Sequence, residues 1–268
     1  MIETRSVIAS DGVATAVRIA GTRGPALVFI HGVGSTAAIW DSQLNALSDE
    51  YRCYAIELRG NGVPKPDPDP ATIDRVGYAR DVLSIIDAFG VEQFCIIGCS
   101  LGGVVAFELW QHVSARISAL AIVGSFARYP DADAYVERVT TAVKQAGTMR
   151  AFAQERAAAL GLPSGRLHET IEQMACKEVA SYLAATRATW TGNYCALLPS
   201  ITAPTWVTLG ERDTVAPLVL SREIAEAVPG SEFSVIPGAG HVANADAADA
   251  FNASLRAFLT RAMGIDSM

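Results

Sequence analysis

The sequence predicts an α/β fold with a mostly parallel sheet and helices on both of its faces. Short, continuous apolar runs such as residues 26–30 and 117–123 have the composition of strands that are covered on both faces. Segments with helical spacing separate these runs, and alternating strands and helices are typical of a parallel sheet. The chain has 268 residues, half of them hydrophobic, which fits one large domain or a domain with an insertion.

Strands and helices alternate in order along both ends of the chain. The first two strands, at 7–8 and 13–19, are joined by a turn at residues 10–12 and predict a hairpin. We expect six further strands at 26–30, 51–58, 94–98, 117–123, 205–209 and 232–236. We expect helices between them at 39–47, 73–89, 104–112, 218–228 and 245–263. Four prolines within residues 63–70 predict an extended surface loop.

The pattern changes between residues 130 and 199, where strand-like runs are absent. Helical spacing appears at 132–146, 149–160, 167–174 and 179–190, with a break at Pro163-Ser164-Gly165. We therefore expect residues 130–199 to form a helical insertion in a core made of residues 1–129 and 200–268. Its basic residues are expected to be solvated at the surface. They are Arg138, Lys144, Arg150, Arg156, Arg166 and Arg187.

Charge and composition exclude several classes of function. The net charge is −7 and no cluster of Lys and Arg is present, which argues against a nucleic-acid or anionic-membrane partner. No stretch resembles a signal peptide or a membrane span, so neither is expected. The number of cysteines, five, is odd and their spacings match no metal or disulfide pattern, which predicts a reduced, cytoplasmic protein. The oligomeric state, monomer or homodimer, stays open.

The first functional signal is a Gly-x-Ser-x-Gly sequence between a predicted strand and a predicted helix. A serine at the tip of such a tight turn needs an unusual backbone conformation. Gly98 and Gly102 avoid Cβ clashes where the two elements crowd together. The Ser100 hydroxyl would project beyond the sheet toward the first amides of the helix, so Ser100 is the candidate nucleophile. The alternatives are an incidental serine in a glycine-rich turn, or Cys99 as the nucleophile.

A serine hydroxyl needs an adjacent base, and His241 is the candidate. It ends a glycine-rich loop, residues 237–241, that directly follows a predicted strand. Asp213 follows the strand at 205–209 and can fix the tautomer of the imidazole. Glu211, two residues nearer that strand, is the alternative acid; the order Ser, Asp, His along the chain favours Asp213.

A tetrahedral oxyanion needs two backbone donors. The first candidate is the amide of Leu101, directly after the nucleophile. The second is the amide of Val33, because the flanking Gly32 and Gly34 let that backbone approach a substrate closely. Both candidates lie just beyond the ends of predicted strands, where sites in α/β sheets form.

Taken in order, these motifs resemble the α/β-hydrolase superfamily over essentially the whole length of the chain. The motifs are His-Gly-x-Gly at 31–34, Glu-Leu-Arg-Gly-x-Gly at 57–62, Gly-x-Ser-x-Gly-Gly at 98–103, Gly-x-x-Asp at 210–213 and Gly-x-Gly-His at 238–241. The resemblance implies an eight-stranded sheet, with Ser100 as nucleophile, Asp213 as acid and His241 as base. It also implies that residues 130–199 form a helical cap over the site, and that His31 supports the oxyanion loop.

Within the superfamily, residues 38–44, 58–62 and 201–205 are most similar to 3-oxoadipate enol-lactonases and related small esterases. This resemblance implies a cofactor-independent serine hydrolase that acts on a small-molecule ester or lactone. Asn61 and Glu57 depart from the histidine and aspartate that are usual at their positions. A C–C bond hydrolase or a thioesterase would use the same residues, and a ligand-binding receptor on this fold is an alternative of another class. The physiological substrate and pathway stay open.

Overall fold

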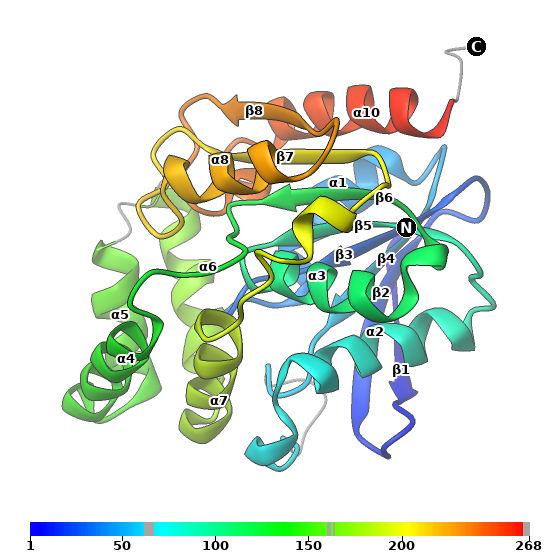
Figure 1. Ribbon diagram of the computed structural model, residues 1–268. Coiled ribbons are helices and arrows are strands. Elements are labelled where there is room, and N and C mark those ends of the chain that lie inside the picture. Colours follow the sequence, from blue (N-terminus) through cyan, green and yellow to red (C-terminus); the bar gives the residue numbers. More distant parts are fainter. Residues whose placement is uncertain (62–66, 160–161, 163, 265–268) are drawn as a thin grey trace.

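A computed structural model describes residues 1–61, 67–159, 162 and 164–264 of the protein. The strands are β1 (Glu3–Ile8), β2 (Ala14–Ala20), β3 (Ala26–Ile30), β4 (Arg52–Glu57), β5 (Phe94–Cys99), β6 (Ile117–Val123), β7 (Thr205–Gly210) and β8 (Glu232–Ile236). They form one sheet in the order β1-β2-β4-β3-β5-β6-β7-β8 (Figure 1). The two pairs that include β2 are antiparallel, and the other pairs are parallel. The predicted mostly parallel sheet is confirmed.

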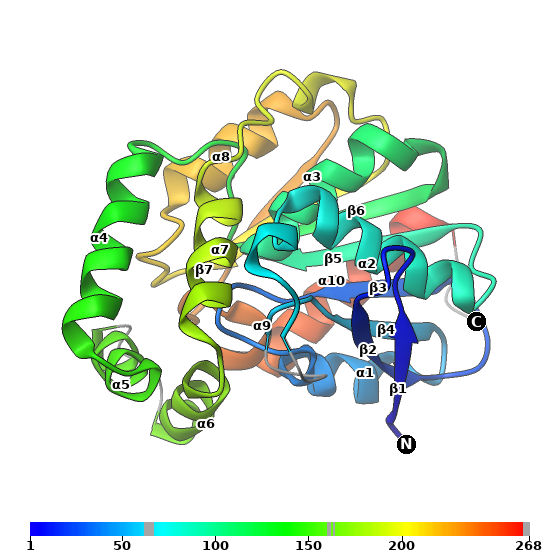
Figure 2. The ribbon, with the colours of Figure 1, turned by 90° about the horizontal axis from the view of Figure 1, so that it is seen from below.

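Helices cover both faces of this sheet. Those of the core are α1 (Asp41–Leu47), α2 (Arg75–Ala88), α3 (Leu101–Val113), α8 (Leu218–Ala227), α9 (Ala243–Asp246) and α10 (Ala248–Met263). Short 3-10 turns precede α1 and α2, as η1 (Ala37–Trp40) and η2 (Pro70–Thr72), and further ones are η3 (Ser114–Arg116) and η4 (Leu198–Ser200). Helices α3 and α8 lie on one side of the sheet and α1 and α9 on the other (Figure 2).

Strand β3 shows why its sequence is a continuous apolar run. Leu27 and Phe29 belong to the hydrophobic cluster that includes α1 and α10, whereas Val28 and Ile30 belong to the cluster that includes α2, α3 and α8. Successive side chains of a strand point to opposite faces, so both faces of β3 are buried and both need apolar residues.

The structure corrects several boundaries expected from the sequence. Residues 39–47 form a 3-10 turn followed by α1, and the expected helix at 245–263 is divided at Ala247 into α9 and α10. Ser164 and Gly165 do not break a helix, because they form the first turn of the helix that ends at Ala175. Residues 63–66 of the proline-rich segment expected to be a loop, and Pro163, lie outside the described residues.

Between β6 and β7 the chain forms α4 (Ala132–Ala146), α5 (Met149–Ala159), α6 (Ser164–Ala175) and α7 (Val179–Trp190). These helices stand together as a group beside the sheet, at the left of Figure 1. Their shared cluster contains residues of α4, α5, α6 and α7, and Val33 of the core packs against it. Lys177, between α6 and α7, donates hydrogen bonds to the carbonyl oxygens of Ser35 and Asn61. The insertion is thus fastened to the loops that follow β3 and β4. Over the described ranges, no helix combines the length and the apolar character that crossing a membrane requires.

Candidate active site

Ser100 occupies the turn between β5 and α3, with φ 54° and ψ −113°. A positive φ at a residue that has a side chain costs about 1–3 kcal/mol, and surrounding packing has to hold it. A Cβ atom at Gly102 would lie 2.1 Å from the carbonyl oxygen of Ile30, and one at Gly98 would lie 2.3 Å from the carbonyl oxygen of Gly102. Only glycine fits at either position. The Ser125 hydroxyl donates a 2.8 Å hydrogen bond to the Ser100 carbonyl oxygen and holds the turn from the other side.

His241 and Asp213 form a direct pair. Nδ1 of His241 lies 2.8 Å from Oδ2 of Asp213, whose side chain is fully buried. The other carboxylate oxygen of Asp213 accepts hydrogen bonds from the N–H groups of Val215 and Ala216, at 2.8 and 2.9 Å. Donation from Nδ1–H leaves Nε2 of the imidazole as the proton acceptor. Glu211, the alternative acid, instead accepts a hydrogen bond from the Gly238 N–H and is exposed.

Leu101 directly follows Ser100 in the chain, and Val33 lines the same cavity as Ser100. Leu101 is the first residue of α3, and the loop that carries Val33 passes so close that a Cβ at Gly32 would lie 3.2 Å from Cβ of Ser100. Gly34, with φ 77°, turns this loop. Within the described ranges, no acceptor pairs with the N–H of Val33 or of Leu101. Both donors are therefore available to an oxygen bound beside Ser100.

His31 supports this loop from behind. Its Nδ1 lies 2.8 Å from the Gly32 carbonyl oxygen, and its Nε2 accepts a 3.2 Å hydrogen bond from the Leu58 N–H. Burial lowers the pKa of His31 to about 3, so the ring is neutral at physiological pH. Glu57 accepts a 2.8 Å hydrogen bond from the Ala37 N–H, and burial raises the pKa of Glu57 to about 7. His31 is thus a structural support rather than a second base.

Ser100 and His241 line one cavity of about 60 Å³. The core supplies Val33, Gly34, Ser35, Ile39, Ser100, Val215, His241 and Val242, and the insertion supplies Arg156, Arg166, Thr170, Gln173, Met174 and Trp190. No hydrogen bond joins the Ser100 hydroxyl to the imidazole of His241 among the described residues. In enzymes without substrate such bonds are often long, and a small rotation of the hydroxyl closes them.

The expectation that the basic residues of the insertion are solvated is wrong for two of them. Arg156 and Arg166 both line the cavity, whereas the other four are exposed. Arg166 pairs with Glu169 and lies 3.7 Å from the carboxylate of Asp246. Arg156 donates a 3.2 Å hydrogen bond to the Tyr135 hydroxyl. Helical spacing does not reveal which side of an insertion packs on the core, so the sequence carried no signal for either contact.

Cys99, the alternative nucleophile, is buried with only 2% of its surface exposed. Burial raises the pKa of its thiol above the ordinary value, with smaller contributions from Asp213 and Asp246. A thiol that stays protonated is a poor nucleophile. The thiol also does not line the cavity that contains Ser100.

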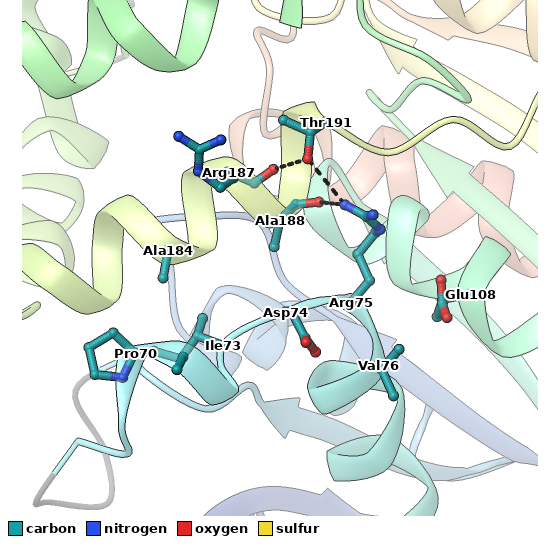
Figure 3. A pocket seen from close by; sticks show the side chains of 11 residues that line it. Pro70, Ile73, Asp74, Arg75, Val76, Glu108, Ala184, Arg187, Ala188 and Thr191 are labelled. Carbon is teal, nitrogen blue, oxygen red and sulfur yellow. Dashed lines mark hydrogen bonds between the residues drawn. The ribbon is translucent and has the colours of Figure 1, made fainter. Parts of the chain in front are cut away.

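A second cleft, of about 460 Å³, lies between η2 and α2 on one side and α7 on the other (Figure 3). Arg75 crosses it, donating to the Ala188 carbonyl oxygen at 3.0 Å and to the Thr191 hydroxyl at 3.3 Å. The cleft shares no residue with the cavity at Ser100. Its described lining residues include no serine, cysteine or histidine.

Comparison with known proteins identifies relatives by sequence and by structure, and their fold is the one described above. A 254-residue stretch is 30% identical to "Putative carbamate hydrolase RutD" of Variovorax paradoxus (strain S110), covering 89% of this chain and 92% of that protein. A 259-residue stretch is 26% identical to 3-oxoadipate enol-lactonase 1 of Acinetobacter baylyi, covering 94% of this chain and 96% of that protein. The crystal structure of a hydrolase from Pseudomonas aeruginosa PA01 superposes with a TM-score of 0.86 at 27% identity, covering 96% of this chain and 98% of that one. The similarity to enol-lactonases inferred from the sequence is confirmed.

The pattern that defines the alpha/beta hydrolase family matches residues 27–254, from β3 into α10. This span contains the strand-turn-helix at Ser100 and the loops that carry Asp213 and His241. The chain therefore belongs to the alpha/beta hydrolase family.

Proposed function

We propose that the protein is a serine hydrolase that cleaves a carboxylic ester or lactone through Ser100, His241 and Asp213. The observation that carries this proposal is the buried Asp213–His241 pair, at 2.8 Å, on the same cavity as a serine held at positive φ. A strained serine beside a tautomer-fixed imidazole is the arrangement that nucleophilic catalysis requires.

The first half of the reaction forms an acyl-enzyme. Nε2 of His241 takes the proton of the Ser100 hydroxyl as Oγ attacks the carbonyl carbon of the substrate. The N–H groups of Leu101 and Val33 stabilise the oxyanion, and each such donor contributes roughly 10²–10³ in rate. The imidazolium, stabilised by Asp213, then protonates the leaving oxygen as the C–O bond breaks.

The second half regenerates the enzyme. His241 takes a proton from water, and the resulting hydroxide attacks the acyl carbon. The Ser100–acyl bond breaks, and the imidazolium returns its proton to Oγ. A lactone follows the same steps, except that the leaving hydroxyl remains attached to the product, which is a hydroxy acid or, from an enol lactone, a keto acid.

The insertion, residues 130–199, serves as the cap that closes the site over the core of residues 1–129 and 200–268. It contributes six of the fourteen residues around the cavity at Ser100. Lys177 fastens it to the loop next to Val33 through the Ser35 carbonyl oxygen, 2.8 Å away. A cavity of about 60 Å³ favours a small acyl group.

The names of the relatives point to a second type of substrate bond besides the ester or lactone bond, namely the carbamate bond. The Acinetobacter protein is named a lactonase and the Variovorax protein a carbamate hydrolase. A carbamate carbonyl is attacked by the same serine and stabilised by the same two amides, so a carbamate is the second candidate substrate. Thioesters and C–C bonds beside a carbonyl need the same residues, and substrate profiling separates all of them.

The test uses hydrolysis of a short-chain aryl ester by wild-type protein, Ser100→Ala and Cys99→Ala. We expect Ser100→Ala to lose about 10⁴-fold or more in kcat, because no other group forms the acyl-enzyme. Cys99→Ala, the matched neighbour, should stay within a few-fold of wild type. Retained turnover by a folded Ser100→Ala protein would refute the proposal.

A further inference from the structure

We propose that Lys177 of the insertion is a positioning residue for catalysis, which holds the loop at residues 31–35 so that the Val33 N–H points at the developing oxyanion. This inference rests on the proposed function at Ser100 and goes beyond it, because it gives the insertion a part in stabilising the transition state. It arises from the way in which the chain fixes a glycine-rich loop that has little rigidity of its own.

The Val33 N–H belongs to a β-turn. The Ser35 N–H donates a 3.2 Å hydrogen bond to the Gly32 carbonyl oxygen, so Gly32 opens the turn and Ser35 closes it. Gly34 stands at the third position with a φ of 77°, where a type II turn needs a positive φ. The hydrogen bond of the turn does not use the Val33 N–H, and this donor can therefore serve a substrate oxygen.

The two glycines make this turn flexible in itself, because glycine has more conformational freedom to lose than any other residue. An oxyanion donor accelerates a reaction only if it is already oriented when the charge develops. The contacts at the two ends of the turn must therefore supply the rigidity. At the first end, Nδ1 of His31 lies 2.8 Å from the Gly32 carbonyl oxygen.

Lys177 fixes the second end of the turn. Its Nζ donates a 2.8 Å hydrogen bond to the carbonyl oxygen of Ser35, the residue that closes the turn. The same Nζ donates to the Asn61 carbonyl oxygen and so ties the turn to the loop that follows β4. Gln173, near the end of α6, accepts a 3.1 Å hydrogen bond from the Ser35 hydroxyl. Both side chains that contact Ser35 in this way come from the insertion.

The ammonium of Lys177 is suited to this role because it is buried. Only 4% of the residue is exposed, so solvent competes little for its donors. A charged donor also forms stronger hydrogen bonds than a neutral one. Burial raises the pKa of Glu57 and the charge of Lys177 opposes that rise, so the two groups interact. A neutral side chain of similar length would fill the same space without holding the Ser35 carbonyl oxygen.

A positioning role predicts which kinetic constant changes. The walls of the cavity bind the substrate before reaction, whereas the Val33 N–H acts mainly once the oxyanion forms. Displacing this donor should therefore lower kcat and leave KM nearly unchanged. A residue that merely supports the insertion should change both constants, because the insertion forms part of the cavity wall.

The test replaces Lys177 by methionine, which has a similar length but neither charge nor donor. Hydrolysis of a short-chain aryl ester is measured together with inhibition by trifluoromethyl ethyl ketone and by the corresponding secondary alcohol. Oγ of Ser100 adds to the carbonyl carbon of the ketone and gives a hemiketal oxyanion, while His241 keeps the hydroxyl proton; the alcohol cannot react. We expect Lys177→Met to lower kcat about 10- to 100-fold and to raise the inhibition constant of the ketone by a similar factor. KM and the inhibition constant of the alcohol should stay within a few-fold of wild type.

Two control variants separate this effect from a loss of charge and from a loosened insertion. Lys144→Met makes the same change at an exposed lysine of α4, and Val143→Ala removes methyl groups from the buried cluster of the insertion. Val143→Ala should lower stability, and both variants should keep kcat and both inhibition constants. Circular dichroism shows whether Lys177→Met folds. If it does not, Lys177→Gln, which is neutral and one bond shorter, is measured with the same expectation.

Three results would overturn the positioning role. They are an unchanged kcat in the folded Lys177 variant, an equal loss of kcat in Val143→Ala, and a parallel rise of KM and of both inhibition constants. Wild-type protein that neither hydrolyses the ester nor forms the adduct with the ketone would instead refute the proposed function, and this inference with it.

Discussion

A Cβ atom at Gly124 would lie 2.9 Å from Oδ2 of Asp213, the oxygen that pairs with His241. Gly124 directly follows β6 and has a φ of 51°. Its missing side chain therefore leaves the space in which the carboxylate and the imidazole meet. The same Cβ would lie 3.4 Å from Nδ1 of His241, so both members of the pair crowd this position.

We therefore expect Gly124→Ala to lower kcat for ester hydrolysis by about 10- to 100-fold, since small misplacements of catalytic groups have effects of this size. The positive φ adds roughly 1 kcal/mol of destabilisation. Gly230→Ala is the control, because Gly230 has a φ of 70° and nothing within 4 Å of the added Cβ. It should share the loss of stability but keep kcat. Equal kcat for both variants would contradict the role given to Gly124.

Glu57 predicts a specific dependence of stability on pH. Burial raises its pKa from 4.5 to about 7 in the folded protein, so between these pH values the folded chain holds a proton that the unfolded chain has released. The unfolding free energy contributed by this group therefore falls as the pH rises through that window. The fall is at most about 1.4 kcal/mol per pH unit.

Glu57→Gln removes this titration while it keeps the acceptor for the Ala37 N–H. Urea unfolding of both proteins at about pH 5 and about pH 8 measures the effect. The wild-type protein should lose more stability than Glu57→Gln over that interval. Nε2 of His31 lies 3.5 Å from Oε1 of Glu57, but burial lowers the pKa of His31 to about 3, so the folded ring is neutral at both pH values and its titration does not create the difference. Identical losses would show that Glu57 is ionised at both pH values.

Met174 forms part of the wall of the cavity at Ser100. It is 4% exposed, lines the cavity and approaches Gly34, where a Cβ would lie 2.9 Å from its Cε. Wild-type protein should prefer acetyl over hexanoyl esters, and Met174→Ala should shift kcat/KM toward the longer chain. The ratio of the two kcat/KM values measures this. Met149→Ala removes an equally buried methionine that does not line the cavity. It should cost similar stability, about 2–5 kcal/mol, without moving the ratio. A shift in both variants would point to a general loosening of the insertion.

The sequence predicted the sheet well because its strands are local patterns. The runs at 26–30 and 117–123 match β3 and β6 to the residue, since a strand covered on both faces is mostly apolar. Helix ends were less accurate. The closing helix is divided at Ala247, whose φ of −138° and ψ of 59° are not helical. The amino-acid composition around Ala247 does not indicate this division.

The residues of the candidate site also differ in whether the sequence could reveal them. Ser100, Asp213 and His241 could be named from local motifs that follow strands. The cavity positions of Arg156 and Trp190 could not be predicted, because they depend on how the insertion packs on the core, which is a long-range contact. Gly124 had a weak signal, as a glycine that directly ends an apolar strand.

The central claim is that Ser100 is a nucleophile activated by His241 and Asp213. The most direct test is labelling of the native protein with a fluorophosphonate, followed by peptide mass spectrometry. We expect one phosphonyl group per chain, attached to Ser100, with labelling slowed strongly in His241→Gln. A folded wild-type protein that leaves Ser100 unmodified, or that carries the label on another residue, would contradict it.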